Sequence, residues 1–598
     1  MSGTKVINDF SITIATVNGS GSQTANVTIL RALFKMGIPV SGKNLFPSNI
    51  QGQPTWYTIR VNKDGYLARR DEHEIVVALN PASFARDLAN VLPGGAFFHA
   101  DDINLPITRD DIVVYPMPVK EIIRKQGITP NLRDMVANMV YVGILAQLLG
   151  IDMKKVHQAL DFHFKGNEKA VDTNNKTAEI SAAWAATHME KRDIYYVRSM
   201  DKTKDLIMTD GNTAAALGAI YGGVQFAAWY PITPATSLAE ALNNYLPTLR
   251  KAENGAQTYA IIQAEDELAA IGMAIGAGWA GLRAMTSTSG PGLSLMTEYA
   301  GLAYYAEVPI VIWDIQRIGP STGLPTRTSQ GDLTFVNFMG HGDTQYVILL
   351  PGTINECFEF GWLAFDLAER LQTPIFILSD LDMGMNQWMA QPLQYPDRPM
   401  DRGKVLWEKD LEARNGIWAR YKDIDGDGIP YRTIPGNPHP SSAWLGRGTG
   451  HDENARYTED AVTWEANMAR LRRKFESTRR YVPKPIIETM DDADVGIIAY
   501  GSTHPAVQEA RYLLNKENNI KTDYLRLRAL PCTQEVFDFV KTHQRLYVAE
   551  ANRDSQLRQM LTLAMPEHGA RFLSACHSDG LPLTARWVRD AILVQENK

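Results

Sequence analysis

The sequence predicts a multidomain α/β protein built on parallel sheets. Its 598 residues are too many for one hydrophobic core and suggest about three or four domains. Short apolar runs alternate with segments of helical spacing, which is typical of a parallel sheet with helices on both faces. Polar turns containing Gly or Pro stand where several of these runs end. The pattern divides the chain into residues 1–190, 205–385, 386–488 and 489–598.

The first segment shows strand and helix signals in alternation. A strand over residues 11–17 leads through a glycine-containing turn into a helix over residues 24–36. Its other expected elements are strands over residues 57–61, 74–79, 96–100 and 111–115, and a long helix over residues 132–149. The polar stretch 166–176 and the residues up to about 205 are interpreted as the exit from this segment and a linker.

The second segment is predicted to be another α/β unit. Helices are expected after its first three strands and over residues 354–371. We interpret the Ala- and Gly-rich run 214–232 as a buried helix followed by a strand, because it contains Gln225 and ends in a Pro-containing turn. The six expected strands cover residues 226–229, 259–263, 282–285, 309–315, 346–350 and 374–378.

The last two segments differ in character. Residues 386–488 are rich in Trp, Pro, Gly and charge with little periodicity, so we expect an insertion of long ordered loops. The charged run 468–480 is predicted to be a solvated helix leading out of this insertion. Residues 489–598 return to alternation, with strands expected over residues 495–500, 521–527, 545–549 and 571–575, each followed by a helix.

Composition narrows the functional classes. A net charge of −7 and a pI near 6.0 give no basic footprint for nucleic acid or an anionic membrane. Cys357, Cys532 and Cys576 lie far apart, which argues against a disulfide framework, a zinc site or an iron–sulfur motif in this chain. The first residues lack a basic and apolar cleavable signal, so a cytoplasmic protein is expected.

Two turns at strand ends in the second segment carry the first functional signals. Residues 230–234 read Tyr-Pro-Ile-Thr-Pro, and Thr233 is predicted to be an N-cap with Pro234 at the first helical position. Glu265 follows the second strand and precedes a small-residue helix over residues 268–280. In parallel sheets ligands bind at such turns.

Two further turns complete the pattern. Residues 287–292 lead from the third strand into a helix over residues 293–306, and Arg317 follows the fourth strand. Parallel strands place all four turns along one edge of the sheet. One carboxylate, one arginine, backbone amides and hydroxyls would then share a crevice that suits an anionic substrate beside a cofactor.

Each residue alone also has a purely structural interpretation. Glu265 is compatible with an acidic residue stabilised at a helix N-terminus. Arg317 is compatible with a surface salt bridge, and the Gly-Pro-Gly turn at 290–292 with a simple connector. Their occurrence together favours the functional interpretation.

These turns resemble a known family. Residues 205–385 are similar to the alpha subunit of the thiamine-dependent 2-oxoacid:ferredoxin oxidoreductases, through the Tyr-Pro-Ile-Thr-Pro motif and stretches 265–272, 288–296 and 319–326. The last stretch is most similar to the 2-oxoglutarate-type members. The resemblance implies a thiamine-enzyme pyrimidine-type domain here, a gamma-like domain over 1–190, through residues 19–23 and 46–50, and a transketolase C-terminal-like domain over 489–598.

The resemblance also implies roles for individual residues. The family decarboxylates 2-oxoacids on thiamine diphosphate, whose aminopyrimidine ring is held by a glutamate. Glu265 matches this glutamate best, with Glu267 as the second candidate. Thr233 corresponds to the threonine near substrate and cofactor, and Arg317 would pair with a substrate carboxylate. The implied cofactor-binding positions are Glu265, Thr233, Pro231, Ile232, Gly19, Gly21, Ser48 and Asn49, the last four for coenzyme A in the gamma-like domain. A tight turn alone explains the Gly19 and Gly21 pattern equally well.

The remaining machinery is expected on a partner. The family holds diphosphate and Mg²⁺ on a Gly-Asp-Gly turn after a strand, but residues 426–428 of this chain lack such a frame. No metal ligand is therefore assigned to this chain, and a beta subunit is expected to hold the diphosphate, Mg²⁺ and a [4Fe-4S] cluster. Ferredoxin is the implied electron acceptor, and an assembly of two alpha and two beta subunits is expected. Pyruvate or branched 2-oxoacids remain alternative substrates, and a non-catalytic scaffold remains an alternative function.

A separate motif resembles a calcium loop. Asp423, Asp425 and Asp427 place oxygens at the first, third and fifth positions of an EF-hand-like loop. The twelfth position is Ile434 rather than Glu, so the motif is incomplete. A structural loop with Asx turns is the favoured interpretation.

Overall fold

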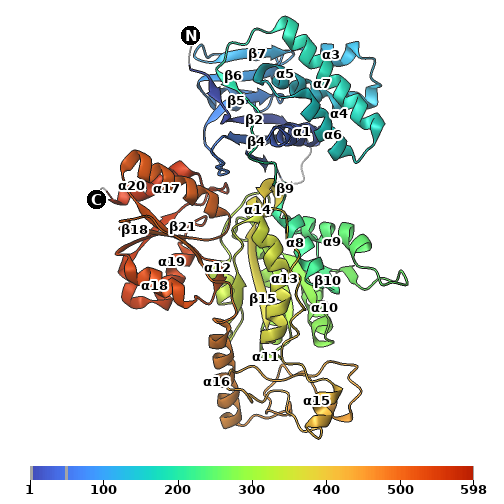
Figure 1. The fold of residues 1–598 in the computed structure, drawn as a ribbon, viewed down its shortest axis with the longest axis vertical. Helices are drawn as coiled ribbons and strands as arrows, with labels where there is room; N and C mark the ends of the chain where they lie inside the picture. The colour runs from blue at the N-terminus through green and yellow to red at the C-terminus, as the bar shows by residue number, and fades with distance from the viewer. Residues whose placement is uncertain (1–3, 48–51, 597–598) are drawn as a thin grey trace. The chain divides into compact units, whose positions relative to one another are not determined.

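The structure is a computed structural model that describes residues 4–47 and 52–596. Its contacts divide the chain into two compact units (Figure 1). Unit 1 comprises Met1–Thr209, Asn386–Pro392 and Thr584–Trp587, and unit 2 comprises Asp210–Met385, Leu393–Leu583 and Val588–Lys598. The four segments predicted above are finer than this division, and their boundaries remain predictions.

Unit 1 contains a six-stranded sheet in the order β3-β4-β2-β5-β6-β7. β2, β5, β6 and β7 run parallel, as predicted, but β4 is antiparallel to both β2 and β3. The expectation of a wholly parallel sheet is therefore wrong at this edge, because β3 and β4 are joined by a connection too short for a parallel crossover. The strands are β2 (Asp9–Val17), β3 (Val40–Leu45), β4 (Pro54–Asn62), β5 (His73–Ala78), β6 (Val91–Ala100) and β7 (Val113–Met117).

The helices of unit 1 correct two other expectations. The polar stretch predicted to be a linker forms α7 (Glu168–His188), which packs on α5 (Met139–Leu149). A Cβ added at Gly143 would lie 2.0 Å from the carbonyl oxygen of Ala178, so glycine permits this close approach. The helix expected over residues 132–149 is two helices that meet at Asn138. The other helices are α1 (Ser22–Lys35), α2 (Phe84–Ala89), α3 (Val119–Lys125), α4 (Pro130–Ala137) and α6 (Met153–Phe164).

Short strands complete unit 1. β1 and β8 pair in parallel, and β9 pairs antiparallel with β16 from the later part of the chain. Their bounds are β1 (Val6–Ile7), β8 (Tyr195–Tyr196), β9 (Ile207–Thr209) and β16 (Trp388–Ala390).

Unit 2 is built around a seven-stranded sheet in the order β11-β10-β12-β13-β15-β14-β20. The six strands predicted in the second segment are all confirmed and run parallel, and β20 adds an antiparallel edge. The seven strands of this sheet are β10 (Phe226–Trp229), β11 (Ala260–Gln263), β12 (Ala284–Thr288), β13 (Ile310–Gln316), β14 (Val347–Leu349), β15 (Pro374–Asp380) and β20 (Ala529–Leu530).

Helices pack tightly on this sheet. α8 is buried and is followed by β10, which confirms the interpretation of the Ala- and Gly-rich run. A Cβ at Gly218 would lie 2.2 Å from the carbonyl oxygen of Phe358, so α8 and α13 touch backbone to backbone. Within the described residues, no helix is both long and apolar enough to cross a membrane. The helices are α8 (Gly211–Tyr221), α9 (Thr236–Leu249), α10 (Glu267–Trp279), α11 (Gly290–Tyr305), α12 (Leu333–Asn337), α13 (Ile354–Leu371) and α14 (Leu381–Met385).

Residues 393–488 are mostly ordered loops around α15 (Glu408–Ala413) and α16 (Ala461–Thr478), as expected (Figure 1). The expectation of a solvated α16 is wrong on one face, because Arg470 and Lys474 are buried against Glu307. The Nζ of Lys474 lies 2.7 Å from Oε2 of Glu307. Charge composition alone does not reveal that charged residues on one face of a helix are buried against an oppositely charged residue.

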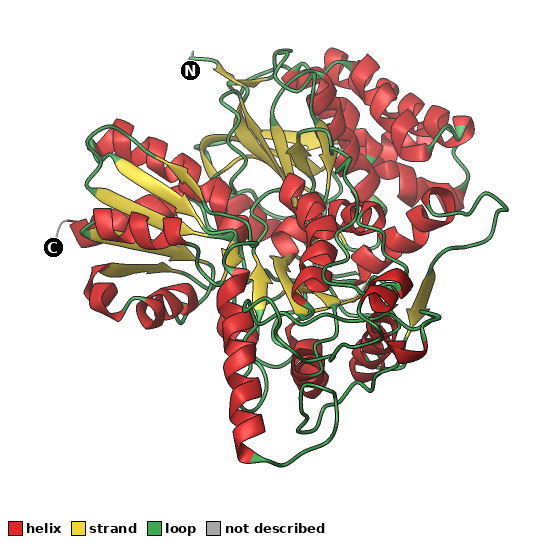
Figure 2. Cartoon of the chain, turned by 60° about the horizontal axis from the view of Figure 1, so that its bottom comes forward, coloured by secondary structure: helices red, strands yellow, loops and turns green. Residues whose placement is uncertain are grey.

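The C-terminal part of unit 2 carries a five-stranded sheet in the order β17-β19-β18-β21-β22. Figure 2 shows its strands lying between helices on both faces. The four strands predicted here are confirmed and run parallel, and β17 pairs antiparallel at the edge. The elements are β17 (Ile486–Glu488), β18 (Val495–Ala499), β19 (Thr522–Arg526), β21 (Arg545–Glu550), β22 (Phe572–Cys576), α17 (His504–Asn518), α18 (Gln534–Thr542), α19 (Gln556–Ala564) and α20 (Ala585–Glu596).

Candidate functional site

The turn after β10 places Thr233 beside Arg317. The Nη1 of Arg317 donates to the backbone carbonyl oxygen of Thr233 at 2.9 Å. The structure therefore brings these two predicted residues together although 84 positions separate them in the chain. Arg317 is only 8% exposed, and its Nε has no hydrogen-bond partner among the described residues. Burial lowers the pKa of Arg317, and the Asp332 carboxyl opposes this shift.

The predicted capping role of Thr233 is wrong. The helix begins at Thr236 with Ala235 in the N-cap position, and the Thr233–Pro234 peptide is cis. The amide of Thr236 donates to the carbonyl oxygen of Ile232 at 3.0 Å, so the chain makes an extra turn before the helix. Thr233 therefore lies in the turn before the helix and not at the helix N-cap.

The turn after β11 holds the two candidate glutamates in different settings. Asp266 caps α10, accepting from the amide of Ala269 at 2.7 Å. Glu265 is exposed, whereas Glu267 is only 7% exposed. A Cβ added at Gly292 would lie 2.8 Å from Cγ of Glu267, so Glu267 packs against the first turn of α11. The two carboxylates therefore differ in burial although only one residue separates them.

A cavity of about 640 Å³ opens beside Arg317. Its walls come from the first turn of α11, the loop after β13, the start of α12 and a loop of the C-terminal sheet domain. Of the four predicted turns, those after β12 and β13 line this cavity, whereas Thr233 and Glu265 are not among its lining residues. The C-terminal domain adds a wall that the sequence pattern did not reveal. The charged residues of the lining are Arg317, Asp332, Arg553 and Asp554.

Sequence reasoning missed two neighbouring carboxyl groups, of which Asp332 lines this cavity and is partly buried. Asp314 is fully buried in β13, and Asp332 lies at the start of α12. Burial raises the pKa of Asp314 well above its ordinary value, with the Asp332 charge adding to the effect. Burial also raises the pKa of Asp332, to about 6, while Asp314 and Arg317 act in the opposite direction. The available signal was one acidic residue within the apolar run Ile310–Gln316.

The residues at this edge fit the aminopyrimidine half of thiamine diphosphate. That ring needs a carboxylate partner, and Glu265 and Glu267 stand beside β11, an edge strand of the sheet. Two buried hydroxyl oxygens nearby, Thr286 Oγ1 and Ser289 Oγ, lack a hydrogen-bond partner among the described residues. Such unpaired groups are expected where a ligand completes a site. By contrast, the described residues contain no group of three His, Cys, Asp or Glu side chains that could hold a metal.

The calcium-like loop is closed by a lysine. The Nζ of Lys404 lies 2.7 Å from Asp425 Oδ2 and 2.8 Å from Asp427 Oδ1. Arg473 pairs with Asp423 at 3.1 Å. Side-chain cations therefore neutralise these aspartates, as the structural interpretation of the loop requires. Residues 426–428 also lie in irregular structure rather than between a strand and a helix.

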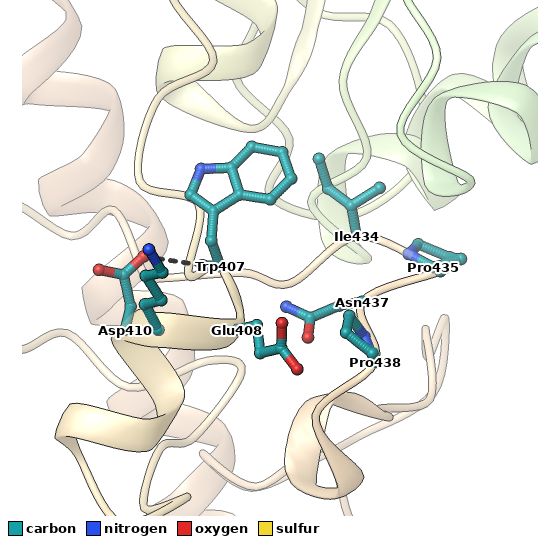
Figure 3. A pocket seen from close by; sticks show the side chains of 9 residues that line it. Trp407, Glu408, Asp410, Ile434, Pro435, Asn437 and Pro438 are labelled. Atoms are coloured by element: carbon teal, nitrogen blue, oxygen red, sulfur yellow. Dashed lines mark hydrogen bonds between the residues drawn. The ribbon is translucent and has the colours of Figure 1, made fainter.

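A second pocket lies in the same part of the chain and contains none of the predicted site residues. Figure 3 shows it between the start of α15 and residues 434–438. The backbone amide of Trp407 donates to Asp410 at 2.8 Å, and both residues are exposed. Its charged side chains are solvent-accessible, so nothing in it marks a ligand site.

In unit 1, the turn before α1 has the backbone expected for an anion-binding loop. Gly19 and Gly21 both have positive φ, at 88° and 77°, and Gly21 is the N-cap of α1. Helix N-termini of this kind bind phosphate groups. Contacts of Gly19 and Gly21 with coenzyme A stay a prediction, and Ser48 and Asn49 lie outside the described residues.

Two protein-family models match the chain. Residues 217–415 match the thiamine diphosphate-binding model of pyruvate flavodoxin/ferredoxin oxidoreductases. Residues 11–184 match the model named pyruvate ferredoxin/flavodoxin oxidoreductase. The first match includes Thr233, Glu265, Glu267 and Arg317, and the second includes Gly19 and Gly21.

Similar proteins agree with these matches. The alpha subunit of 2-oxoacid:ferredoxin oxidoreductase 2 from Aeropyrum pernix is 28% identical over 92% of both chains. The 2-oxoglutarate synthase subunit KorA from Methanothermobacter marburgensis is 35% identical over 57% of this chain and 87% of its own. Among solved structures, 2-oxoglutarate:ferredoxin oxidoreductase from Magnetococcus marinus, with 2-oxoglutarate, coenzyme A and succinyl-CoA bound, has a TM-score of 0.87 and 27% identity. That likeness covers 98% of this chain and 99% of the other.

Proposed function

The chain belongs to the alpha subunits of the 2-oxoacid:ferredoxin oxidoreductases, and on that basis we propose that it acts on 2-oxoglutarate. The enzyme converts 2-oxoglutarate and coenzyme A to succinyl-CoA and CO₂ and passes two electrons to ferredoxin. The same groups serve the reverse, reductive carboxylation. Support for the substrate comes from the 2-oxoglutarate synthase relatives and from the ligands of the Magnetococcus marinus structure.

Within this chain, Arg317 is the proposed partner of a substrate carboxylate. Its guanidinium is buried, is held by the Thr233 carbonyl oxygen and lines the cavity. A buried arginine with an unpaired Nε offers a charge-assisted hydrogen bond that a carboxylate completes. The buried and partly unpaired guanidinium of Arg317 is the single observation on which the proposal rests.

Thiamine diphosphate, when bound, supplies the carbon nucleophile and stores the electron pair released by decarboxylation. Residues 231–233 and the Glu265–Glu267 turn are proposed to hold and orient its aminopyrimidine ring. Burial favours Glu267 over Glu265 as the carboxylate that contacts this ring, because a desolvated charge keeps a fixed position. Coenzyme A is the proposed ligand of the Gly19–Gly21 turn.

A beta subunit is proposed to complete the active site. β11 is an edge strand with three of its four residues exposed. Leu268, Met273 and Leu295 expose apolar side chains on the neighbouring helices α10 and α11. An exposed strand edge beside apolar helices favours association. This subunit would hold the diphosphate, Mg²⁺ and a [4Fe-4S] cluster, in an assembly of two alpha and two beta subunits that transfers electrons to ferredoxin.

Dye reduction by the assembled enzyme tests the proposal. The chain is produced with its beta subunit, and anaerobic reduction of a low-potential viologen is followed with 2-oxoglutarate, pyruvate and 2-oxoisovalerate. We expect 2-oxoglutarate to give the highest kcat/KM. Arg317→Met should lower kcat/KM by about 10²-fold or more, because a charge-assisted hydrogen bond to substrate is lost.

A control variant and the other substrates distinguish the proposed function from its alternatives. Arg456→Met removes an exposed arginine from the loop region and should leave kcat/KM unchanged. A preference for pyruvate or 2-oxoisovalerate would reassign the substrate. Unaltered dye reduction by both Arg317→Met and the double variant Glu265→Gln/Glu267→Gln would show that this subunit is a scaffold.

A further inference from the structure

Two carboxyl groups close to Arg317, those of Asp314 and Asp332, lie near enough for each to shift the pKa of the other. Asp314 projects from β13 and is fully buried, and Asp332 stands at the start of α12. The side chain of Gln316 fixes the second group, because its Oε1 accepts from the backbone amide of Asp332 at 3.0 Å. A Cβ added at Gly290 would lie 2.9 Å from Asp332 Oδ2, so this carboxyl also rests on the first turn of α11.

Within the described residues, neither oxygen of Asp314 nor Oδ2 of Asp332 has a hydrogen-bond donor directed at it from any other residue. Two buried carboxyls in contact cannot both ionise, so one proton stays between them. Asp314 holds this proton, because its side chain is fully buried whereas Asp332 is only partly buried at the cavity wall.

Arg317 is the cation that Asp332 faces. Both side chains line the same cavity, and each shifts the pKa of the other. Tyr500 is buried and both carboxyls help to raise its pKa, and Arg553 and Asp554 line the same cavity as Asp332. Arg553 is exposed and pairs with Asp554 at 2.7 Å, so among the described residues Arg317 is the cation for which an effect on Asp332 is resolved.

We propose that Asp332 is the internal counter-charge of Arg317, and that the Asp314–Asp332 pair takes up one proton when a substrate carboxylate binds Arg317. The inference rests on the proposed role of Arg317 in substrate binding. Without substrate, the negative charge of Asp332 balances the guanidinium. An arriving carboxylate takes over that role, and the two anions would repel each other at close range. One proton from solvent then neutralises Asp332, and the buried site keeps a single positive and a single negative charge.

Proton uptake on binding makes the affinity for the substrate anion depend on pH in one direction. The substrate-free pair binds its second proton with a pKa of about 6. Above this pH a proton must be taken up on binding, so affinity for the anion falls as pH rises, by up to about tenfold per pH unit. Below this pH the pair is already neutral and affinity is flat. The dependence appears in KM and not in kcat.

Glutarate is the probe, because it carries both carboxylates of 2-oxoglutarate but has no 2-oxo group to react. Its competitive inhibition constant is measured with the holoenzyme from about pH 6 to about pH 8.5. We expect the constant to rise with pH in the wild type and to be flat in Asp332→Asn. Calorimetry of glutarate binding in phosphate and in Tris buffer should show uptake approaching one proton per site, with no variant needed.

Two further variants make the test specific. Asp380 is a buried acid in β15, the strand that pairs with β13, and burial raises its pKa to about 6, in the same pH range. The rise of the inhibition constant with pH should persist in Asp380→Asn. A slope that survives Asp332→Asn, or absence of proton uptake by the wild type, would overturn the proposal. Failure of the proposed function looks different, because glutarate would then bind Arg317→Met as tightly as the wild type.

Discussion

At the scale of single residues, local sequence and burial gave different information about the glutamates. Spacing identified Glu265 and Glu267 together, because both stand in the turn after β11. Only packing distinguishes them, since Glu267 contacts the first turn of α11 while Glu265 is exposed. Local sequence was also insufficient to place Thr233. Its residue type suits a helix cap, yet the helix begins three residues later.

Separate replacement of the two glutamates tests this assignment. Glu267→Gln in the assembled enzyme should lower kcat by about 10²- to 10⁴-fold, because a positioned carboxylate that assists proton transfer is lost. Glu265→Gln should lower it less than about tenfold. Dye reduction with 2-oxoglutarate measures both, and thiamine diphosphate content controls for loss of cofactor. The reverse order of effects would restore Glu265 as the contacting group.

At the scale of elements, α16 is fixed by buried charge. Glu307 is fully buried just after α11 and pairs with Arg470 and Lys474 of α16. Burial raises the pKa of Glu307, but the two cations outweigh it and hold the pKa at about 2. Because the folded pKa lies below the ordinary value of 4.5, this stabilisation is full above about pH 4.5 and is lost as pH falls toward about 2. The charged run 468–480 predicted the helix, but not its buried partner.

Glu307→Gln should therefore destabilise unit 2. Two buried cations lose their counter-charge, which costs about 3–5 kcal/mol. Thermal unfolding followed by circular dichroism near neutral pH measures the loss as a lower Tm. Glu465→Gln removes an exposed carboxylate from the same helix and should leave Tm within the error of the measurement. An equal Tm for Glu307→Gln and the wild type would contradict this account of how α16 is held.

At the scale of the whole molecule, unit 2 has an edge that it does not cover itself. β11 exposes its backbone edge, and α10 exposes Gly276, where an added Cβ would meet no atom within 4 Å. The small residues of this helix permit the close approach of another chain. The predicted division of cofactor binding between two subunits belongs to this scale, because it depends on a surface that the chain leaves exposed.

Gly276→Trp tests this surface without disturbing the chain that carries it. The indole fits into open space, so the variant should fold with an unchanged Tm, but it should no longer purify with the beta subunit. Val462→Trp, on an exposed position of α16, is the matched control and should keep the partner. Iron and thiamine diphosphate in the purified sample report the same outcome. Retention of both by Gly276→Trp would place the interface elsewhere.

Much of the fold followed from local pattern. The parallel strands of the sheets in unit 2 were predicted because apolar runs of strand length alternate with helical spacing. Pattern failed where tertiary contacts override composition. β3 lies in a polar run at a sheet edge that the pattern does not predict. The polar residues of α7 predict a linker, although small residues give this helix a buried face. Both elements are stabilised by distant neighbours rather than by their own sequence.

By itself, the sequence determined where strands end and which polar residues stand at those ends, because strand periodicity and turn chemistry are local. Only the tertiary structure decided which of these residues meet. Arg317 reaches the carbonyl of Thr233, Asp314 faces Asp332, and Glu307 holds two cations from α16. Each pairing depends on burial and on the packing of elements far apart in the chain, and desolvation then sets the charge of the groups.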